Sequence, residues 1–236
     1  MKRTIEVCLS PALIGCYALQ GKTAVVIDVL RATSAMVAAL ANGVFAIRPV
    51  ATVEECREWV AKGYQGAAER EGQVVSGFEI GNSPLAFMKA GYRQAYVALT
   101  TTNGTKAMNM SGEAEQIIAG AFVNLDAVVN YLEAGNRSVV LVCAGWKDNF
   151  NLEDTLFAGA VVHALSGSFQ PACDAALAAQ ALYQQHAANL MGAIEQSSHF
   201  KRLAKLGIEE DIRFCLQANH FNLVPVLKEG LLIAHQ

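Results

Sequence analysis

The sequence predicts an α/β protein, specifically a three-layer α/β/α fold with a largely parallel or mixed sheet. Short β-branched or apolar runs alternate with helical patterns through residues 4 to 143, which is the rhythm of a parallel sheet with helices on its faces. Hydrophobic residues fill 53% of the 236 positions and charged residues only 17%, so the chain can bury a large core.

The alternation places strands and helices in turn along the first part of the chain. Strands are expected near residues 4–9, 23–29, 44–50, 94–99, 114–119 and 137–143. Helices are expected near residues 32–42, 52–62, 83–90, 105–110 and 123–134. Capping residues such as Thr33, Thr52 and Asn124, and glycines such as Gly43 and Gly135 after helix ends, support these bounds.

Helical patterns dominate the chain after residue 150. The expected helices lie near residues 152–166, 172–194, 198–206 and 209–217, followed by a short strand near 223–227. No linker, low-complexity tract or internal repeat divides the sequence. We therefore expect one unit over residues 1–236, built as a single body or as two lobes over about 1–150 and 151–236.

Composition and motifs exclude several classes of protein. Lys plus Arg number 18 and Asp plus Glu 21, a balance that argues against general binding of nucleic acid or an anionic membrane. The start is a poor signal peptide, and no apolar run reaches the roughly 18 residues of a spanning helix. The cysteines form no CxxC pair and the histidines no HxH or HExxH. We predict a cytoplasmic protein with reduced thiols, and its low charge favours a homo-oligomer, most simply a dimer.

Polar residues gather at four junctions between predicted elements, of which the first is VVIDVLRATS, residues 25–34. Asp28 ends an apolar strand, and Arg31, Thr33 and Ser34 open the next helix. A helix start offers free N–H groups to a phosphate, and a carboxylate at the end of an apolar strand needs a role. In the alternative interpretation, Thr33 is only a cap and Arg31 is only a surface partner for Asp28.

The second junction comprises AAERE and GFEIGNSP, residues 67–71 and 77–84. It supplies Glu69, Arg70 and Glu79, followed by Asn82 and Ser83 before a helix. A solvated ion pair and an ordinary helix start explain these residues equally well.

TTNGTKA, residues 101–107, is the third junction. Thr102, Asn103, Gly104 and Thr105 offer hydroxyl, amide and backbone donors, and Lys106 adds a positive charge without a neighbouring carboxylate. This is the chemistry of an anion pocket, although the same residue types also form ordinary turns between a strand and a helix.

The fourth junction is VCAGWKDNFNLEDT, residues 142–155. Lys147 lies in the loop, and Glu153 and Asp154 open the next helix. The helix dipole alone favours acids in a first turn, so each acid taken singly has a structural explanation.

The four junctions together favour a site for a small phosphorylated substrate. Ligands bind at the carboxyl ends of strands in open α/β sheets, and hard oxygen ligands suit Mg²⁺ holding a phosphate. No GxxxxGK[ST] or GxGxxG motif is present, and Leu30 rather than an acid follows two residues after Asp28, unlike haloacid dehalogenases. The candidate metal ligands are Asp28, Glu69, Glu79, Glu153 and Asp154.

The same stretches, in the same order, resemble the 2-phosphosulfolactate phosphatase family. The resemblance is carried by DVLRAT (28–33), ER followed by GFEIGNSP (69–84), TTNGT (101–105), CAG followed by LEDT (143–155) and the closing EDIRFCLQANHFNLVPVL (210–227). It departs from the family pattern at Lys106, Glu79 and Glu71, where Arg, Asp and Gly are expected, and in the bulkier GWKDNFN loop.

The resemblance implies a Mg²⁺-dependent phosphatase that converts 2-phospho-3-sulfolactate to sulfolactate and phosphate, a step towards coenzyme M, or that acts on a related phosphorylated hydroxy acid. It also implies an α/β fold peculiar to that family. We assign Asp28, Arg31 and Lys106 to catalysis. The substrate-binding set is Thr33, Ser34, Arg70, Asn82, Ser83, Thr102, Asn103, Gly104, Thr105 and Lys147.

Three alternatives stay open on the sequence alone. A metal-dependent lyase or aldolase could use the same anion contacts, and a small-anion-binding module could use them without turnover. Asp28 could also attack phosphorus itself. Because no second acid follows two residues later to act as acid/base partner, we favour attack by water with Asp28 as a metal ligand.

Overall fold

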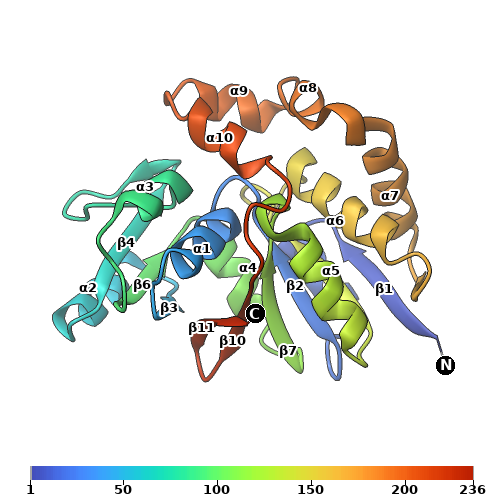
Figure 1. Cartoon of the computed structure of the whole chain (residues 1–236), viewed down its shortest axis with the longest axis horizontal. Coiled ribbons are helices and arrows are strands. Elements are labelled where there is room, and N and C mark those ends of the chain that lie inside the picture. Colours follow the sequence, from blue (N-terminus) through green and yellow to red (C-terminus); the bar gives the residue numbers. More distant parts are fainter. Residues whose placement is uncertain (1, 236) are drawn as a thin grey trace.

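The computed structural model describes residues 2–235 and contains one mixed sheet of eleven strands (Figure 1). Their order across the sheet is β5-β4-β6-β3-β11-β10-β7-β2-β8-β1-β9. The strands are β1 (Arg3–Cys8), β2 (Thr23–Ile27), β3 (Ala46–Pro49), β4 (Gln65–Arg70), β5 (Gln73–Val74), β6 (Tyr96–Thr100), β7 (Gln116–Gly120), β8 (Val139–Cys143), β9 (Phe169–Pro171), β10 (Val224–Lys228) and β11 (Leu231–His235). This architecture confirms the predicted fold class.

Two groups of parallel strands make up most of the sheet. Strands β4, β6 and β3 form one group, and β7, β2, β8, β1 and β9 form the other. The antiparallel hairpin β10–β11 joins the groups through a single residue pair on each side, Val226 with Ile118 and Leu232 with Ile47. The sheet is therefore mixed because its last hairpin links two parallel halves.

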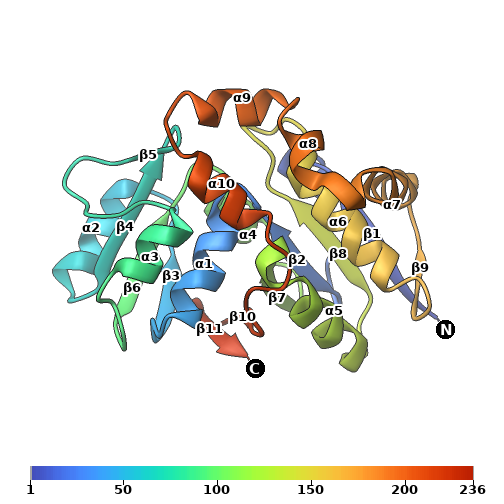
Figure 2. The ribbon, with the colours of Figure 1, turned by 45° about the horizontal axis from the view of Figure 1, so that its top comes forward.

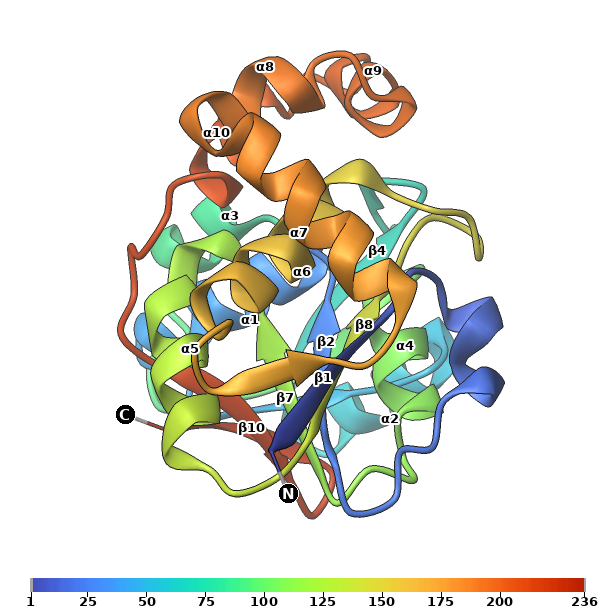
Figure 3. The ribbon, with the colours of Figure 1, turned by 90° about the vertical axis from the view of Figure 1, so that its right-hand side faces the viewer.

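Helices cover both faces of the sheet (Figure 3). They are α1 (Ala32–Ala41), α2 (Val53–Ala61), α3 (Pro84–Lys89), α4 (Gly104–Met110), α5 (Leu125–Ala134), α6 (Leu152–Ala164), α7 (Asp174–His186), α8 (Leu190–Ile194), α9 (Ser198–Ala204) and α10 (Glu209–Cys215). Within residues 2–235, none of them combines the length and the apolar character needed to cross a membrane. The six cysteines, which all lie in this range, are free thiols.

Helix α1 lies at the centre of the molecule, above the hairpin that joins the two halves (Figure 2). Its sequence ATSAMVAALA is apolar nearly all round, which is the composition of a helix without a solvent face. Residues 32–40 are all buried, and the helix contacts α3 and β3 as well as β7 and β10. The first turn of α1 is consequently held between the carboxyl ends of strands from both halves.

Several elements differ from the sequence-based expectations. The structure adds β4, β5, β9 and β11. The first three are short or contain polar and small residues, whereas β11 is the apolar segment LLIAH, which the sequence analysis missed. In β4, a Cβ added at Gly66 would lie only 2.7 Å from the Phe78 ring. Glycine is therefore needed at a strand position where a β-branched residue would be the usual signal. The helix expected over 172–194 is divided, because α7 ends at His186 and Asn189 caps α8. 

Candidate functional site

Four buried carboxylates lie near one another where strands of both halves end. Asp28 follows β2, Glu69 belongs to β4, and Glu153 and Asp154 begin α6. Their residues are 7, 4, 0 and 1% exposed. Burial raises the pKa of Asp154 well above its usual range, and the charges of Glu153 and Asp28 raise it further. Four of the five acids that the sequence suggested as metal ligands therefore lie close enough for their charges to affect one another, and Glu79 is the exception.

Two of the four acids position loops. Both oxygens of Asp154 accept backbone hydrogen bonds, from the Val29 N–H at 2.9 Å and from the Gly145 N–H at 3.0 Å. Asp154 therefore fixes the loops that follow β2 and β8. Glu69 does the same in the other half, because its carboxylate accepts hydrogen bonds from the N–H groups of Gly72 at 2.6 Å and Thr102 at 3.0 Å.

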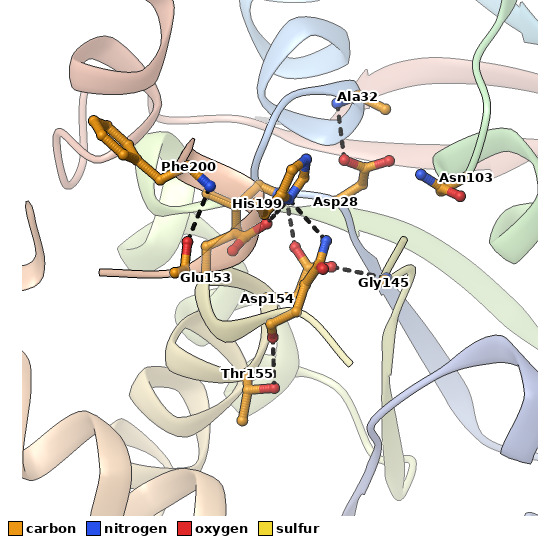
Figure 4. A network of polar contacts seen from close by, with 12 residues as sticks. Asp28, Ala32, Asn103, Gly145, Glu153, Asp154, Thr155, His199 and Phe200 are labelled. Atoms are coloured by element: carbon orange, nitrogen blue, oxygen red, sulfur yellow. Dashed lines mark hydrogen bonds and ion pairs between the residues drawn. The ribbon is translucent and has the colours of Figure 1, made fainter. Parts of the chain in front are cut away.

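Asp28 and Glu153 retain oxygens without partners. Asp28 Oδ1 accepts a hydrogen bond from the Ala32 N–H at 3.3 Å, whereas Oδ2 has no hydrogen-bond partner among residues 2–235. Glu153 Oε1 contacts His199 Nδ1, and the buried Oε2 is unpartnered within the same range (Figure 4). Buried polar atoms are normally satisfied, so Glu153 Oε2 indicates a site for a positive ligand, and the free Oδ2 of Asp28 is a second oxygen that such a ligand could use.

The electrostatics of Asp28 also indicate an uncompensated negative site. Burial raises the pKa of Asp28 to about 7, and the nearby charges of Glu69 and Glu153 add to this effect. The Ala32 N–H and His199 act in the opposite direction. A cation bound beside Asp28 would stabilise its charged form and restore a normal carboxylate.

Close approach to Asp28 explains the glycine of the TTNGT loop. An added Cβ at Gly104 would lie 2.8 Å from Asp28 Oδ2 and 2.6 Å from the Ala32 Cβ. The loop is fixed by Thr101 and Thr105, whose hydroxyls exchange hydrogen bonds with each other's backbone N–H groups at 3.2 to 3.3 Å. The TTNGT loop of the third junction therefore lies directly against the carboxylate of Asp28, which belongs to the first junction.

A cavity of about 560 Å³ adjoins the TTNGT loop on the side of β4 and β6. Its lining residues are Ala51, Arg70, Thr101, Thr102, Thr105, Lys106, Asn109 and Met110. Lys106 Nζ pairs with Asp148 at 2.7 Å, and both side chains are more than 40% exposed. Exposed ion pairs of this kind contribute at most about 1 kcal/mol, so Lys106 can exchange Asp148 for an anionic ligand.

The other predicted anion contacts at these loops already have partners. The Arg70 guanidinium donates to the Glu69 carbonyl at 2.7 Å and to the Thr100 hydroxyl at 2.9 Å. Lys147 Nζ forms an exposed pair with Glu71 at 2.7 Å, and the Lys147 N–H donates to Asn103 Oδ1 at 3.1 Å. Asn103 thus joins the third junction to the fourth.

Arg31 does not face the carboxylates, contrary to its expected role in catalysis. Its guanidinium pairs with Asp211 of α10 and donates to Asn82 Oδ1 at 3.0 Å and to the Gly72 carbonyl at 3.1 Å. Ser83 caps α3 and donates to Asp211 at 2.7 Å. A buried guanidinium needs a buried carboxylate, and α10 supplies it. Arg31, Asn82 and Ser83 therefore tie α1, α3 and α10 together.

Three further candidates have structural contacts in place of a ligand. The Thr33 hydroxyl contacts the carbonyls of Asp28 and Gly120 at 2.8 to 2.9 Å, and the Ser34 hydroxyl donates to the Val29 carbonyl at 2.8 Å. Both residues are fully buried, so they shape the loop after β2. Glu79 is exposed and accepts a hydrogen bond from the Tyr92 hydroxyl at 3.2 Å, away from the carboxylate cluster.

The Arg31–Asp211 pair gives a test of structure rather than of activity. Replacing Asp211 with Ala leaves the buried Arg31 charge without its carboxylate, and we expect the free energy of unfolding to fall by about 3 to 5 kcal/mol. Urea unfolding measures it. The control is Glu210→Ala, which removes an exposed acid from the same first turn and should cost less than about 1 kcal/mol. Equal losses in the two variants would contradict this role of Asp211.

Comparison with known proteins decides the family. The model of the family described as 2-phosphosulpholactate phosphatase matches residues 8–230. The chain belongs to the 2-phosphosulfolactate phosphatase family. A Thermotoga maritima protein named "Probable 2-phosphosulfolactate phosphatase" is 42% identical over 97% of each chain. Proteins of the same name from Caldanaerobacter subterraneus and a Synechococcus strain are 38% and 41% identical, covering 92% of both chains and 86 to 87% respectively.

Membership in the 2-phosphosulfolactate phosphatase family confirms the resemblance seen in the sequence motifs. It also confirms the predicted enzyme class, because the family is one of phosphoric monoester hydrolases. Within residues 2–235, no three His, Cys, Asp or Glu side chains form a ready-made metal cage. Mg²⁺ does not require one, since it keeps several waters and is commonly held by one or two carboxylates together with a substrate phosphate. The unpartnered oxygens of Asp28 and Glu153 fit that requirement.

The sequence of this 2-phosphosulfolactate phosphatase family member did not indicate two residues that lie beside the carboxylates. His199 contacts Glu153 and also Asn151, whose side-chain nitrogen lies 2.9 Å from His199 Nδ1. Arg202 lies one turn further along α9, with its guanidinium 3.3 Å from the centroid of the Trp146 ring. Both belong to a short helix far along the chain from any strand end, so no local motif indicated them.

Proposed function

We propose that this protein is a Mg²⁺-dependent phosphatase that hydrolyses 2-phospho-3-sulfolactate to 3-sulfolactate and inorganic phosphate. The observation that carries the proposal is the pair of buried carboxylates, Asp28 and Glu153, each with an oxygen that lacks a partner within residues 2–235. Family membership supports the substrate, because the relatives carry its name. The adjoining cavity supports a substrate with more than one anionic group.

Asp28 and Glu153 are the residues that would hold Mg²⁺. The donor set consists of hard oxygens in a buried, negatively charged site, which is the environment that Mg²⁺ prefers. When bound, the ion supplies charge neutralisation to the oxygens of the transferred phosphoryl group. Asp154 and Glu69 act as positioning residues, because their hydrogen bonds fix the loops that carry the other groups.

The remaining anionic groups of the substrate fit the cavity lined by the TTNGT loop. Lys106 supplies a charge that can leave Asp148, and Thr102, whose hydroxyl donates to Glu69 at 3.1 Å, lines the cavity beside it. Phosphate ester hydrolysis depends mainly on placing the ester and balancing its charge. Residues that fix the distal end of a small substrate therefore contribute directly to the rate.

An assay with defined metal content tests the proposal. Phosphate release from 2-phospho-3-sulfolactate should require Mg²⁺ and fall to about a hundredth or less with excess chelator, because the carboxylates alone repel the phosphoryl oxygens. Calorimetric titration should show Mg²⁺ binding that weakens in Glu153→Gln. The control is Glu210→Gln on the exposed face of α10, which should bind Mg²⁺ normally.

Three outcomes of this assay would contradict the proposal. Undiminished phosphate release from metal-free protein would remove the metal role. Products of carbon–carbon cleavage without phosphate would identify a lyase. Saturable binding of the ester without any product would identify an anion-binding module.

A further inference from the structure

The helices that follow α7 pass over the carboxyl edge of the sheet (Figures 1 and 2). Helix α9, residues Ser198–Ala204, contributes two side chains toward the carboxylate cluster. His199 contacts Glu153 from one turn of this helix, and its ring lies 5.9 Å from that of Trp146. Arg202 also lies over the Trp146 ring, with its guanidinium carbon 3.3 Å from the ring centroid.

Arg202 differs from the other basic side chains near the site. Its two terminal nitrogens are buried and have no hydrogen-bond partner within residues 2–235. Arg31 and Arg70 have carboxylate, carbonyl or hydroxyl partners, and Lys106 and Lys147 form ion pairs. Leaving buried donors unpaired is costly, so the free nitrogens of Arg202 indicate that a bound anion completes this part of the site.

The surroundings of Arg202 show which anion it meets. Burial lowers the pKa of Arg202, and the charges of Glu71, Glu69, Glu153 and Asp28 counteract that effect. Contacts place the guanidinium beside Glu153, because Arg202 lies on the Trp146 ring, and the neighbouring His199 contacts Glu153, a proposed Mg²⁺ ligand. The distal cavity, in contrast, is lined by Arg70 and Lys106 and does not include Arg202.

We propose that Arg202 binds the phosphoryl group of the substrate directly, as a cation supplied by α9 over the carboxylate cluster. The inference rests on the proposed phosphatase function and adds a residue to it. A guanidinium presents two parallel N–H donors that match two oxygens of a phosphoryl group, and stacking on Trp146 holds the plane of this fork in one orientation. Its charge offsets the charge that spreads over the phosphoryl oxygens during transfer.

Two substrates distinguish the phosphoryl group from the sulfonate. We expect Arg202→Ala to lower kcat/KM by about 10²- to 10³-fold on both 2-phospho-3-sulfolactate and 2-phospholactate, which lacks the sulfonate. Arg202→Lys should recover part of the loss, because it restores the charge without the bidentate fork. Arg213→Ala removes an exposed arginine from the neighbouring α10 and should leave both rates unchanged.

A binding measurement keeps the inference testable if the wild-type protein proves not to be a phosphatase. With Trp59 replaced by Phe, Trp146 is the single tryptophan and reports on the anion that its stacked arginine binds. Inorganic phosphate should change its fluorescence in the presence of Mg²⁺, and Arg202→Gln should weaken phosphate binding at least 10-fold. Three results would each overturn the proposal: an Arg202→Ala loss confined to 2-phospho-3-sulfolactate, an unchanged rate in Arg202→Ala, or unchanged phosphate binding in Arg202→Gln.

Discussion

Replacing Asp28 with Asn is expected to lower kcat/KM for 2-phospho-3-sulfolactate by about 10³-fold. The amide has the size of the carboxylate, and its oxygen can still accept the hydrogen bond from the Ala32 N–H. It carries no charge, so it can neither hold a cation firmly nor act as a nucleophile. Steady-state phosphate release with saturating Mg²⁺ measures the effect. Asp126→Asn, an exposed acid in the first turn of α5, is the control.

The same substitution should stabilise the metal-free protein at neutral pH. Burial raises the pKa of Asp28 from 3.8 to about 7, so the folded chain holds a proton that the unfolded chain releases between those values. Wild-type stability therefore falls as the pH rises through this window. Asp28→Asn lacks this loss, and its advantage in free energy of unfolding should grow from near zero at about pH 4 to about 4 kcal/mol at about pH 8.

Urea unfolding in chelator at several pH values measures this advantage. A difference that does not change with pH would contradict the buried, uncompensated state of Asp28. An active Asp28→Asn variant would contradict its chemical role. If Asp28→Asn is inactive, a single turnover of the wild-type enzyme in ¹⁸O-water tells a nucleophile from a metal ligand. A nucleophilic Asp28 would acquire ¹⁸O in its carboxylate, and a metal ligand would not.

The fold class could be predicted because the strongest signals in the sequence come from buried elements. Runs such as residues 23–27 and 139–143 are apolar on both faces, and α1 is apolar all round, so burial alone identifies them. Strand β4 gave no such signal, because its sequence QGAAER combines small and charged residues. Its strand conformation depends on pairing with β6 and β5, which no local pattern reveals.

The positions of the site acids could be predicted for a similar reason. A carboxylate that directly follows a buried strand must lie at the carboxyl edge of the sheet, and this rule gives the position of Asp28. Glu153 and Asp154 are located in the same way, because they follow the loop after β8. Their different functions could not be predicted. Whether an acid has free oxygens, as Glu153 does, or has both engaged, as Asp154 does, depends on backbone N–H groups from distant loops.

The basic residues illustrate the limit of sequence analysis more clearly. Arg31 stands at a helix start beside Asp28, where a phosphate contact is the natural expectation. The structure instead gives it Asp211, which is 180 positions away along the chain. Arg202 shows the opposite case, because nothing around it in the sequence distinguishes it from a surface arginine. Its role depends on α9 crossing over the site, which is a property of the tertiary fold.

Replacing Gly104 with Ala is expected to lower kcat/KM by about 10²-fold or more, although the protein should remain folded. Gly104 is the first residue of α4, where alanine is an excellent helix former. The added methyl group would nevertheless lie 2.8 Å from Asp28 Oδ2 and 2.6 Å from the Ala32 Cβ, so either the TTNGT loop or the Asp28 side chain must move. Such a shift displaces the oxygen that is proposed to hold Mg²⁺.

A second glycine separates this effect from a general cost of substitution. Gly91 is exposed, and an added Cβ there meets nothing within 4 Å, so Gly91→Ala should keep full activity. The measurement pairs kcat/KM with Mg²⁺ titration, because displacement of Asp28 should weaken Mg²⁺ binding in Gly104→Ala and leave it unchanged in Gly91→Ala. Full activity in Gly104→Ala would show that the loop adjusts without disturbing Asp28. In that case the close contact between the first and third junctions would have no part in catalysis.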